Sequence, residues 1–225
     1  MIITVGNQKG GTGKSLIAQT LAVYASRTQA VLLIDADKQA SCSLWYEQRQ
    51  QLINDNEEGV EMTDNLSVIH ADGQSIKSVA QSSGYDLVLI DVGGYNSRNM
   101  ELSLMASDVI IAPTQPKGND VLSLDPFVHD IKTGIEQKRH MRKGALFTYV
   151  VFNIVPTHPS YKDAAEAKEF VQNNIEVTGV IDSVLRNRVD YDRLSSSGRT
   201  ALEGKKQIRQ EAEQCMSEIS KMVGI

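Results

Sequence analysis

Short apolar runs alternate with amphipathic stretches along the chain. Runs of valine, isoleucine and leucine predict strands buried on both faces, and they cover residues 2–6, 31–34, 66–69, 86–90, 109–112, 146–152 and a short stretch near 180–185. Apolar positions at helical spacing predict helices near residues 14–27, 41–53, 74–83, 97–106, 118–138, 160–173 and 203–223. Because strands that alternate with helices are joined by right-handed crossovers, we expect an α/β fold: a doubly wound, mostly parallel sheet with helices on both faces.

The connection between the first predicted strand and the first predicted helix is rich in glycine. Residues 8–15 read Gln-Lys-Gly-Gly-Thr-Gly-Lys-Ser. Glycines permit the tight turn that points backbone N–H groups at phosphate oxygens, and the N-terminus of the following helix attracts the same anion. Lys14 and Ser15 occupy the positions that place an ammonium group on the β- and γ-phosphates and a hydroxyl on Mg²⁺. The pattern therefore predicts a nucleotide-binding site.

Aspartates follow two further apolar strands. Asp35 and Asp37 come after residues 31–34, and Asp91 comes after residues 86–90. The carboxyl ends of parallel strands meet at one edge of a sheet, where ligands of open α/β folds bind, so we expect these carboxylates beside the glycine-rich loop. Asp91 is the Walker B candidate. The alternative is that such aspartates form turns or begin helices.

Residues 9–15, Lys-Gly-Gly-Thr-Gly-Lys-Ser, resemble the deviant Walker A loop of the ParA and MinD partition ATPases. The similarity extends to Asp35-x-Asp37-x-Gln39-x-Ser41 with Trp45, to residues 112–116 leading to Asp120, and to residues 184–188 with Tyr191, Gly198 and Glu203. The resemblance is to the short form, which has no DNA-binding domain before its first strand. It implies one P-loop NTPase domain over residues 1–225, with ATP and Mg²⁺ as cofactors.

The resemblance also implies a role for each matching residue. The catalytic residues would be Lys9, Lys14 and Asp37, with Lys9 reaching the nucleotide of the other subunit in an ATP-dependent homodimer. The nucleotide would be bound by Lys9, Gly10, Gly11, Thr12, Gly13, Lys14, Ser15 and Leu16, with Asn153 at the adenine. Mg²⁺ would be held by Ser15, Asp35 and Asp91. A strand-end asparagine is also a common turn residue, which is the alternative for Asn153.

Three departures from the family pattern bear on the rate of hydrolysis. Lys38 stands where the family has a proline, Leu16 where it has a hydroxyl, and Val92-Gly93-Gly94 where it has Thr-Pro-Pro. Loss of the hydroxyl removes a possible phosphate contact, and the two glycines loosen the loop after Asp91. Because no charged catalytic group is lost, we expect a slow but active ATPase. ATP is favoured over GTP, since the sequence has no Asn-Lys-x-Asp guanine motif.

The chain carries a formal net charge of −5, yet the segment from Arg186 to Arg209 has seven basic residues against three acidic ones. Exposed basic clusters bind nucleic-acid backbones without reading sequence. By resemblance, ATP-dependent binding of non-specific DNA would use Arg186, Arg188, Lys205, Lys206 and Arg209. The alternative is a solvated helix face. A second basic cluster, residues 138–143, is interpreted as a helix C-terminus.

Together these features predict a partition protein whose ATP-bound sandwich dimer binds DNA and hydrolyses ATP when a ParB-type centromere-binding partner stimulates it. We expect a cytoplasmic, nucleoid-associated protein without a membrane partner, because no apolar segment is long enough to span a bilayer. One alternative is a MinD-like or cargo-positioning ATPase acting on a membrane or a protein organelle. Others are a metabolic ligase, for which no substrate pocket is identified, an iron–sulfur reductase, for which Cys42 and Cys215 are too few cysteines, and a DNA-binding scaffold without turnover. The apolar face of the last helix is interpreted as core.

Overall fold

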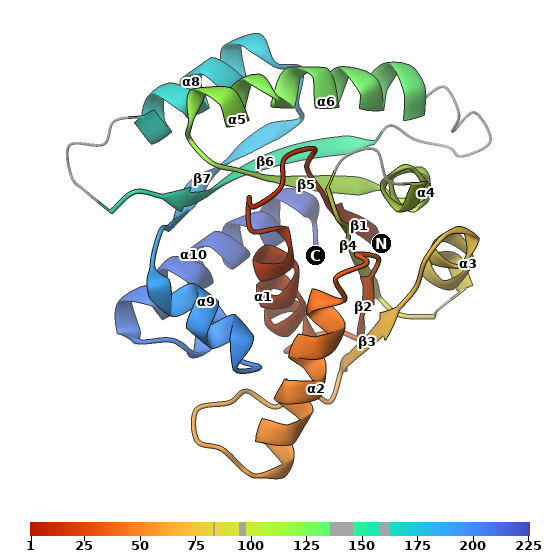
Figure 1. Ribbon diagram of the computed structural model, residues 1–225, viewed down its shortest axis with the longest axis vertical. Coiled ribbons are helices and arrows are strands. Elements are labelled where there is room, and N and C mark those ends of the chain that lie inside the picture. The colour runs from red at the N-terminus through yellow and green to blue at the C-terminus, as the bar shows by residue number, and fades with distance from the viewer. Residues whose placement is uncertain (83, 95–97, 136–145, 158–162) are drawn as a thin grey trace.

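The computed structural model describes residues 1–82, 84–94, 98–135, 146–157 and 163–225. Within these residues one sheet of seven strands has the order β3-β2-β4-β1-β5-β6-β7, and each neighbouring pair is parallel (Figure 1). The strands are β1 (Ile2–Val5), β2 (Val31–Asp35), β3 (Leu66–His70), β4 (Leu87–Asp91), β5 (Val109–Thr114), β6 (Phe147–Val155) and β7 (Gly179–Arg186). All seven predicted strands and the doubly wound α/β fold are confirmed.

The helices are α1 (Lys14–Ser26), α2 (Ser41–Asn54), α3 (Gln74–Ser82), α4 (Arg98–Ala106), α5 (Gly118–Leu122), α6 (Leu124–Asp130), α8 (Asp163–Asn174), α9 (Val189–Ser196) and α10 (Lys206–Val223). A π-helical turn (Ile131–Ile135) follows α6, and a 3₁₀ turn (Ala201–Glu203) precedes α10. The predicted helix ends at 83, 97, 136–138 and 160–162 lie outside the described residues, as does the basic cluster 138–143.

The helices differ from the sequence prediction in three respects. The helix expected over residues 118–138 is interrupted at Ser123 between α5 and α6. Pro126 explains the break, because proline has no N–H to donate to the carbonyl of Leu122. Helix α9 was not predicted, since its eight residues are mostly polar and show little apolar periodicity. The last helix begins at Lys206 rather than at 203, because Thr200 and Glu203 form a capping box around the preceding 3₁₀ turn.

The helices form a layer on each face of the sheet, as Figure 1 shows. Apolar side chains of α1, α2, α9 and α10 pack on one face, and those of α3, α4, α5, α6 and α8 pack on the other. The apolar stripe of α10, which includes Ile208, Ala212, Cys215 and Ile219, is buried in the first of these cores. This burial confirms that the stripe is core. Among the described residues, no helix is long and apolar enough to cross a membrane.

The register of the central strands brings the predicted acidic residues together. Asp91, the last residue of β4, pairs with Val5 at the end of β1 on one side and with Asp35 at the end of β2 on the other. The glycine-rich loop leaves the sheet directly after Val5. The loop and the aspartates therefore lie at the same carboxyl edge, as the sequence predicted.

Candidate nucleotide site and basic surface

The loop between β1 and α1 has the backbone conformation of an anion cradle. Gly11 and Gly13 have φ angles of 71° and 80°, in the left-handed region that favours glycine. A Cβ atom on Gly13 would lie only 2.0 Å from the Nδ2 atom of Asn153. The N-cap residue of α1 is Gly13, so no side chain at this position bonds the first turn. The N–H groups of that turn and the helix dipole are therefore available to a phosphate.

Three polar side chains hold this loop through hydrogen bonds to its backbone. Asn153 is 1% exposed and donates a hydrogen bond to the carbonyl of Thr12 (2.9 Å). Asn7, fully buried, donates to the carbonyl of Pro113 (2.7 Å) and accepts from the backbone N–H of Lys9 (3.2 Å). Gln115 donates to the carbonyl of Gly11 (3.0 Å). The contact of Asn153 is with the loop backbone, and its assignment to the adenine stays a prediction.

Asn7 and Gln115 were missed as candidates by sequence reasoning. Each follows closely on the end of a central strand, β1 for Asn7 and β5 for Gln115. These strands are neighbours in the sheet, so polar residues just beyond their carboxyl ends converge on the loop. Position after an apolar strand was the signal that could have identified both.

The two lysines of the loop have different environments. Lys14 is only 8% exposed, and its Nζ atom donates to the carbonyl of Lys9 (3.1 Å). Burial lowers the pKa of Lys14, while the negative charges of Asp91 and Asp37 act in the opposite direction. Lys9 is about half exposed, and its Nζ atom lies 3.4 Å from Oδ1 of the buried Asp120. Lys14 therefore bonds the backbone of the loop itself, whereas Lys9 pairs with Asp120 of α5.

Asp91 is fully buried at the base of the cradle. The thiol of Cys42 donates to its Oδ2 atom (3.2 Å), and the side chain of Ser15 lies near enough to lower the pKa of the carboxyl against the larger effect of burial. Burial raises the pKa of Asp91 to about 7. Its Oδ1 atom is buried and has no hydrogen-bond partner among the described residues.

These residues fit a magnesium site. A buried carboxylate oxygen without a donor, next to a serine hydroxyl, is a suitable ligand for a hard divalent cation. The described part of the chain contains no group of three His, Cys, Asp or Glu residues that could form a complete metal cage. Mg²⁺ does not require one, since it is usually bound by one or two protein ligands together with water and substrate phosphates.

The carboxylates of Asp35 and Asp37 have different hydrogen-bond partners. The carboxylate of Asp35 is fully buried and accepts from the N–H groups of Asp37 (3.2 Å) and Ser43 (2.7 Å). Asp35 therefore fixes the first turn of α2, which is the helix-starting role that the sequence left open. Asp37 accepts from the N–H of Gln39 (3.0 Å). A Cβ atom on Gly93 would lie 3.1 Å from Oδ1 of Asp37, so the glycine lets the loop after β4 approach this carboxylate closely.

The predicted DNA-binding residues fall into two groups. Arg188 forms a two-point contact with Glu211, at 2.5 Å and 3.3 Å, and Arg186 lies 3.8 Å from the same carboxylate. Lys205, Lys206 and Arg209 are exposed around the start of α10 and form no ion pair with another described residue. Glu211 lies just beyond the segment whose charges were counted, and it neutralises part of the predicted patch.

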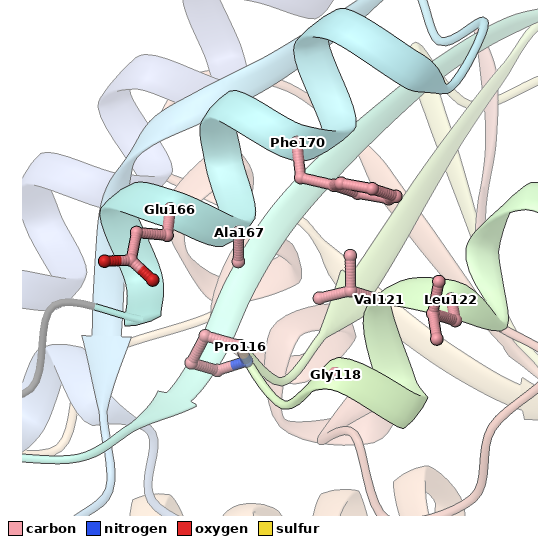
Figure 2. A pocket seen from close by; sticks show the side chains of 7 residues that line it. All are labelled: Pro116, Gly118, Val121, Leu122, Glu166, Ala167 and Phe170. Atoms are coloured by element: carbon pink, nitrogen blue, oxygen red, sulfur yellow. The ribbon is translucent and has the colours of Figure 1, made fainter.

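A separate apolar pocket of about 400 Å³ lies between α5 and α8. Figure 2 shows Phe170 of α8 extending over Val121 and Leu122 of α5, with Pro116 below them. None of the residues assigned to the nucleotide or the metal lines this pocket.

Strand, glycine-rich loop, helix and flanking aspartates at the carboxyl edge of a parallel sheet define the P-loop class of nucleotide-binding domains. Within this class, residues 3–202 match the family described as CbiA, the CobQ/CobB/MinD/ParA nucleotide binding domain. The chain belongs to this family. The family relationship predicted from the deviant loop is therefore confirmed.

Two relatives by sequence are informative. Protein ParA from Rhizobium radiobacter is 20% identical over 201 residues, which is 88% of this chain and 83% of that protein. Maintenance of carboxysome distribution protein A from Gloeobacter kilaueensis is 30% identical over 129 residues. This second match covers 57% of the chain and 55% of the relative.

Solved structures agree with the fold. A plasmid partition protein from Borrelia burgdorferi B31 bound to AMPPNP superposes with a TM-score of 0.68 at 23% identity over 98% of each chain. A McdA–ATP complex from Cyanothece gives a TM-score of 0.71 at 19% identity, covering 100% of this chain and 96% of that one. MinD with Mg-ADP from Pyrococcus horikoshii OT3 gives 0.68 at 18% identity, with coverage of 99% and 97%.

Proposed function

We propose that this protein is an ATP-dependent partition ATPase, that residues 1–225 form a single ATPase domain, and that its cargo is DNA. The observation that carries the proposal is the convergence of Lys14, Ser15 and the unpartnered oxygen of Asp91 on one anion cradle. Relatives named for plasmid partition and ParA support the choice of cargo.

The residues of the cradle divide the work of binding and hydrolysis. Backbone N–H groups of residues 10–16 and the ammonium group of Lys14 bind the phosphates. Ser15, Asp35 and Asp91 would hold Mg²⁺, which would supply positive charge to stabilise the phosphates during hydrolysis. Asp37 lies on the loop after β2, where its carboxylate orients the attacking water and accepts its proton.

The second lysine makes dimerisation part of the mechanism. Lys9 pairs with Asp120 of its own chain. The lysine end of this pair is about half exposed, so water can solvate the ammonium group when Lys9 leaves Asp120. In the ATP-bound dimer it extends to the phosphates held by the other subunit, which makes hydrolysis depend on assembly.

The exposed cations at the start of α10 provide the DNA contact. Lys205, Lys206 and Arg209 bind the phosphate backbone without reading bases. A dimer presents two such surfaces, so its affinity for duplex DNA exceeds that of a monomer. A ParB-type partner at the centromere then stimulates hydrolysis and releases the dimer from the nucleoid.

A second candidate function is the positioning of a protein organelle or a membrane-bound assembly. The match to a carboxysome distribution protein, at 30% identity, favours it. Both functions use the same switch and differ in cargo. Co-sedimentation with liposomes and capture of cargo proteins by the ATP-bound protein separate them from DNA partition.

The proposal is tested by ATP hydrolysis and DNA binding with the Lys9→Ala variant. We expect the variant to bind ATP as a monomer with unchanged affinity, but to lose both hydrolysis and ATP-dependent binding to random-sequence duplex DNA. Lys221→Ala is the matched control, because Lys221 is an exposed lysine at the far end of α10. Full activity of Lys9→Ala would refute the cross-dimer mechanism. Absence of DNA binding with ATP, ADP and no nucleotide would remove DNA as the cargo.

A further inference from the structure

We propose that Arg49 and Glu203 form a buried joint that transmits the nucleotide state from the Asp37 loop, through helix α2, to the basic cluster at the start of α10. This inference rests on the proposed function, in which the Asp37 loop senses ATP and Lys205, Lys206 and Arg209 contact DNA. It assigns positioning roles to two residues that lie outside both sites.

The joint is a desolvated ion pair with several hydrogen bonds around it, although the Nε atom of Arg49 is buried without a hydrogen-bond partner among the described residues. Arg49 and Glu203 have side-chain exposures of 0% and 1%. The guanidinium donates to both carboxylate oxygens, at 2.9 Å and 3.0 Å. It also donates to the carbonyl oxygens of Gly198 (3.2 Å) and Glu61 (2.7 Å). The carboxylate in turn accepts from the N–H groups of Glu61 and Thr200, each at 2.7 Å.

Two further contacts fasten the same helix to the same segment. The indole N–H of Trp45 donates to the carbonyl of Arg199 (3.0 Å). Gly198 has a φ of 77°, and a Cβ atom there would lie 2.6 Å from the backbone nitrogen of Arg49. The backbone of residues 198–203 therefore lies directly against α2, and it moves with the helix rather than independently of it.

One end of α2 belongs to the nucleotide site. The carboxylate of Asp35 bonds the N–H groups of Asp37 and Ser43, so the loop that carries Asp37 and the first turn of the helix share one anchor. Cys42, in the same turn, donates to Asp91. A shift of the loop on nucleotide binding is thus passed to the whole helix, because an α-helix is a rigid element over this length.

The other end of the path is the basic cluster. Lys205 follows Glu203 after a single glycine, and Lys206 begins α10. A pocket of about 330 Å³ next to the joint is lined by Glu203, Lys205 and Arg193, among others. Movement of residues 198–203 therefore changes the position of the first cations of the cluster relative to those farther along α10.

The chemistry of the joint is better explained by specificity than by stability. A buried ion pair costs a large desolvation free energy, and apolar residues of similar volume often stabilise a fold more. The two-point contact between guanidinium and carboxylate fixes the position of residues 198–203 relative to α2, so a displacement of the helix displaces this segment as well. Arg27 provides the contrast, since it bonds Glu61 and Glu213 at a partly exposed surface site.

The test uses the double variant Arg49→Met with Glu203→Gln in the full chain. It removes both charges, so that neither is left buried alone, and it keeps the apolar stem and one acceptor. Arg49→Lys is a second variant that keeps the charge but not the two-point contact. The matched control is Arg27→Met, which breaks an ion pair with the side chain of Glu61 and removes neither of the backbone groups of Glu61 that bond the joint. Two readouts are taken: DNA affinity with ATP and with ADP over a salt series, and amide hydrogen exchange of residues 198–209 with and without AMPPNP.

Coupling between sites is typically 5- to 150-fold, so we expect the wild-type protein and Arg27→Met to bind DNA about tenfold more tightly with ATP than with ADP. In the double variant this ratio falls to about twofold or less with ATP affinity unchanged, and Arg49→Lys lies between. AMPPNP alters exchange in residues 198–209 of the wild type but not of the double variant. An unchanged ATP-to-ADP ratio in the double variant overturns the joint. If the wild type binds no DNA at all, the proposed function fails, and the exchange experiment alone tests the joint. The joint is overturned if AMPPNP does not alter exchange in the wild type, or if it alters exchange equally in the wild type and the double variant.

Discussion

The phosphate cradle and the basic surface were each predicted from a group of residues in the sequence, but folding arranges the two groups differently. In the cradle, the backbone of residues 9–15 forms the site, so residues that are close in sequence are also together in space. On the basic surface, five residues of one predicted set separate into a pair held by Glu211 and a trio exposed to solvent. The cradle is a matter of local backbone geometry, whereas the surface depends on which acidic side chains fold against it.

The comparison shows why a glycine-rich motif is more informative than a cluster of charges. Glycine at a left-handed φ has few substitutes, so its spacing specifies a conformation. A lysine or arginine is compatible with many surroundings, and its net effect depends on partners elsewhere in the chain.

The largest effect is expected from Gly13→Ala. The methyl group would overlap the Asn153 side chain at 2.0 Å, and the residue would have to keep a φ of 80°. The left-handed conformation alone costs about 1–2 kcal/mol for alanine, and relief of the overlap displaces the loop. We therefore expect ATP affinity, measured by calorimetry, to fall by about 100-fold or more.

Gly118→Ala is the matched control for this change. A Cβ atom on Gly118 meets nothing within 4 Å, and its φ is not in the left-handed region. Its ATP affinity should equal that of the wild type. Normal ATP binding by Gly13→Ala would show that local backbone geometry does not determine the cradle.

The second prediction separates chemistry from binding within the cradle. Asp37→Asn keeps the oxygen that accepts from the N–H of Gln39, so the loop conformation should persist. Loss of the carboxylate removes the group that accepts a proton, and hydrolysis should fall by about 100-fold or more. ATP binding and ATP-dependent DNA binding should be retained. Asp64→Asn, at an exposed position, is the control, and equal loss of ATP binding and hydrolysis in Asp37→Asn would contradict the assigned role.

The sequence predicted much of this site because its determinants are local or repeated. The apolar runs predicted every strand, and the ends of β2 and β4 correctly located Asp35 and Asp91 next to each other. It did not show that Asp35 holds the first turn of α2, or that Asn7 and Gln115 support the loop, since these contacts depend on strand order. The pairing of Arg188 with Glu211 was missed because the two residues belong to separate elements: Arg188 precedes α9, and Glu211 lies within α10.

The third prediction concerns the exposed trio. Reversal of two charges, Lys206→Glu with Arg209→Glu, should reduce the number of phosphate contacts by at least two per subunit. Since each contact contributes about −0.9 to the slope of log affinity against log salt, the slope should become shallower by about 2 for each subunit. Hydrolysis without DNA should be unchanged. Lys221→Glu serves as the control on the same helix, and an unchanged slope in the double variant would place the DNA contact elsewhere.

The smallest effect, and the one that bears most directly on the difference between the two regions, is expected from Glu211→Gln. The substitution leaves Arg186 and Arg188 without their carboxylate; Arg186 is the more exposed of the two, at 41% against 18%. DNA affinity should rise by about two- to fivefold and the salt slope should steepen by about 1, because each subunit gains one further phosphate contact. Glu213→Gln changes the net charge equally but leaves Arg27 paired with Glu61, so the two variants distinguish local placement from total charge. An equal gain in both would mean that net charge alone governs binding, whereas a gain in Glu211→Gln alone would show that the predicted patch is present in the sequence and that folding conceals part of it.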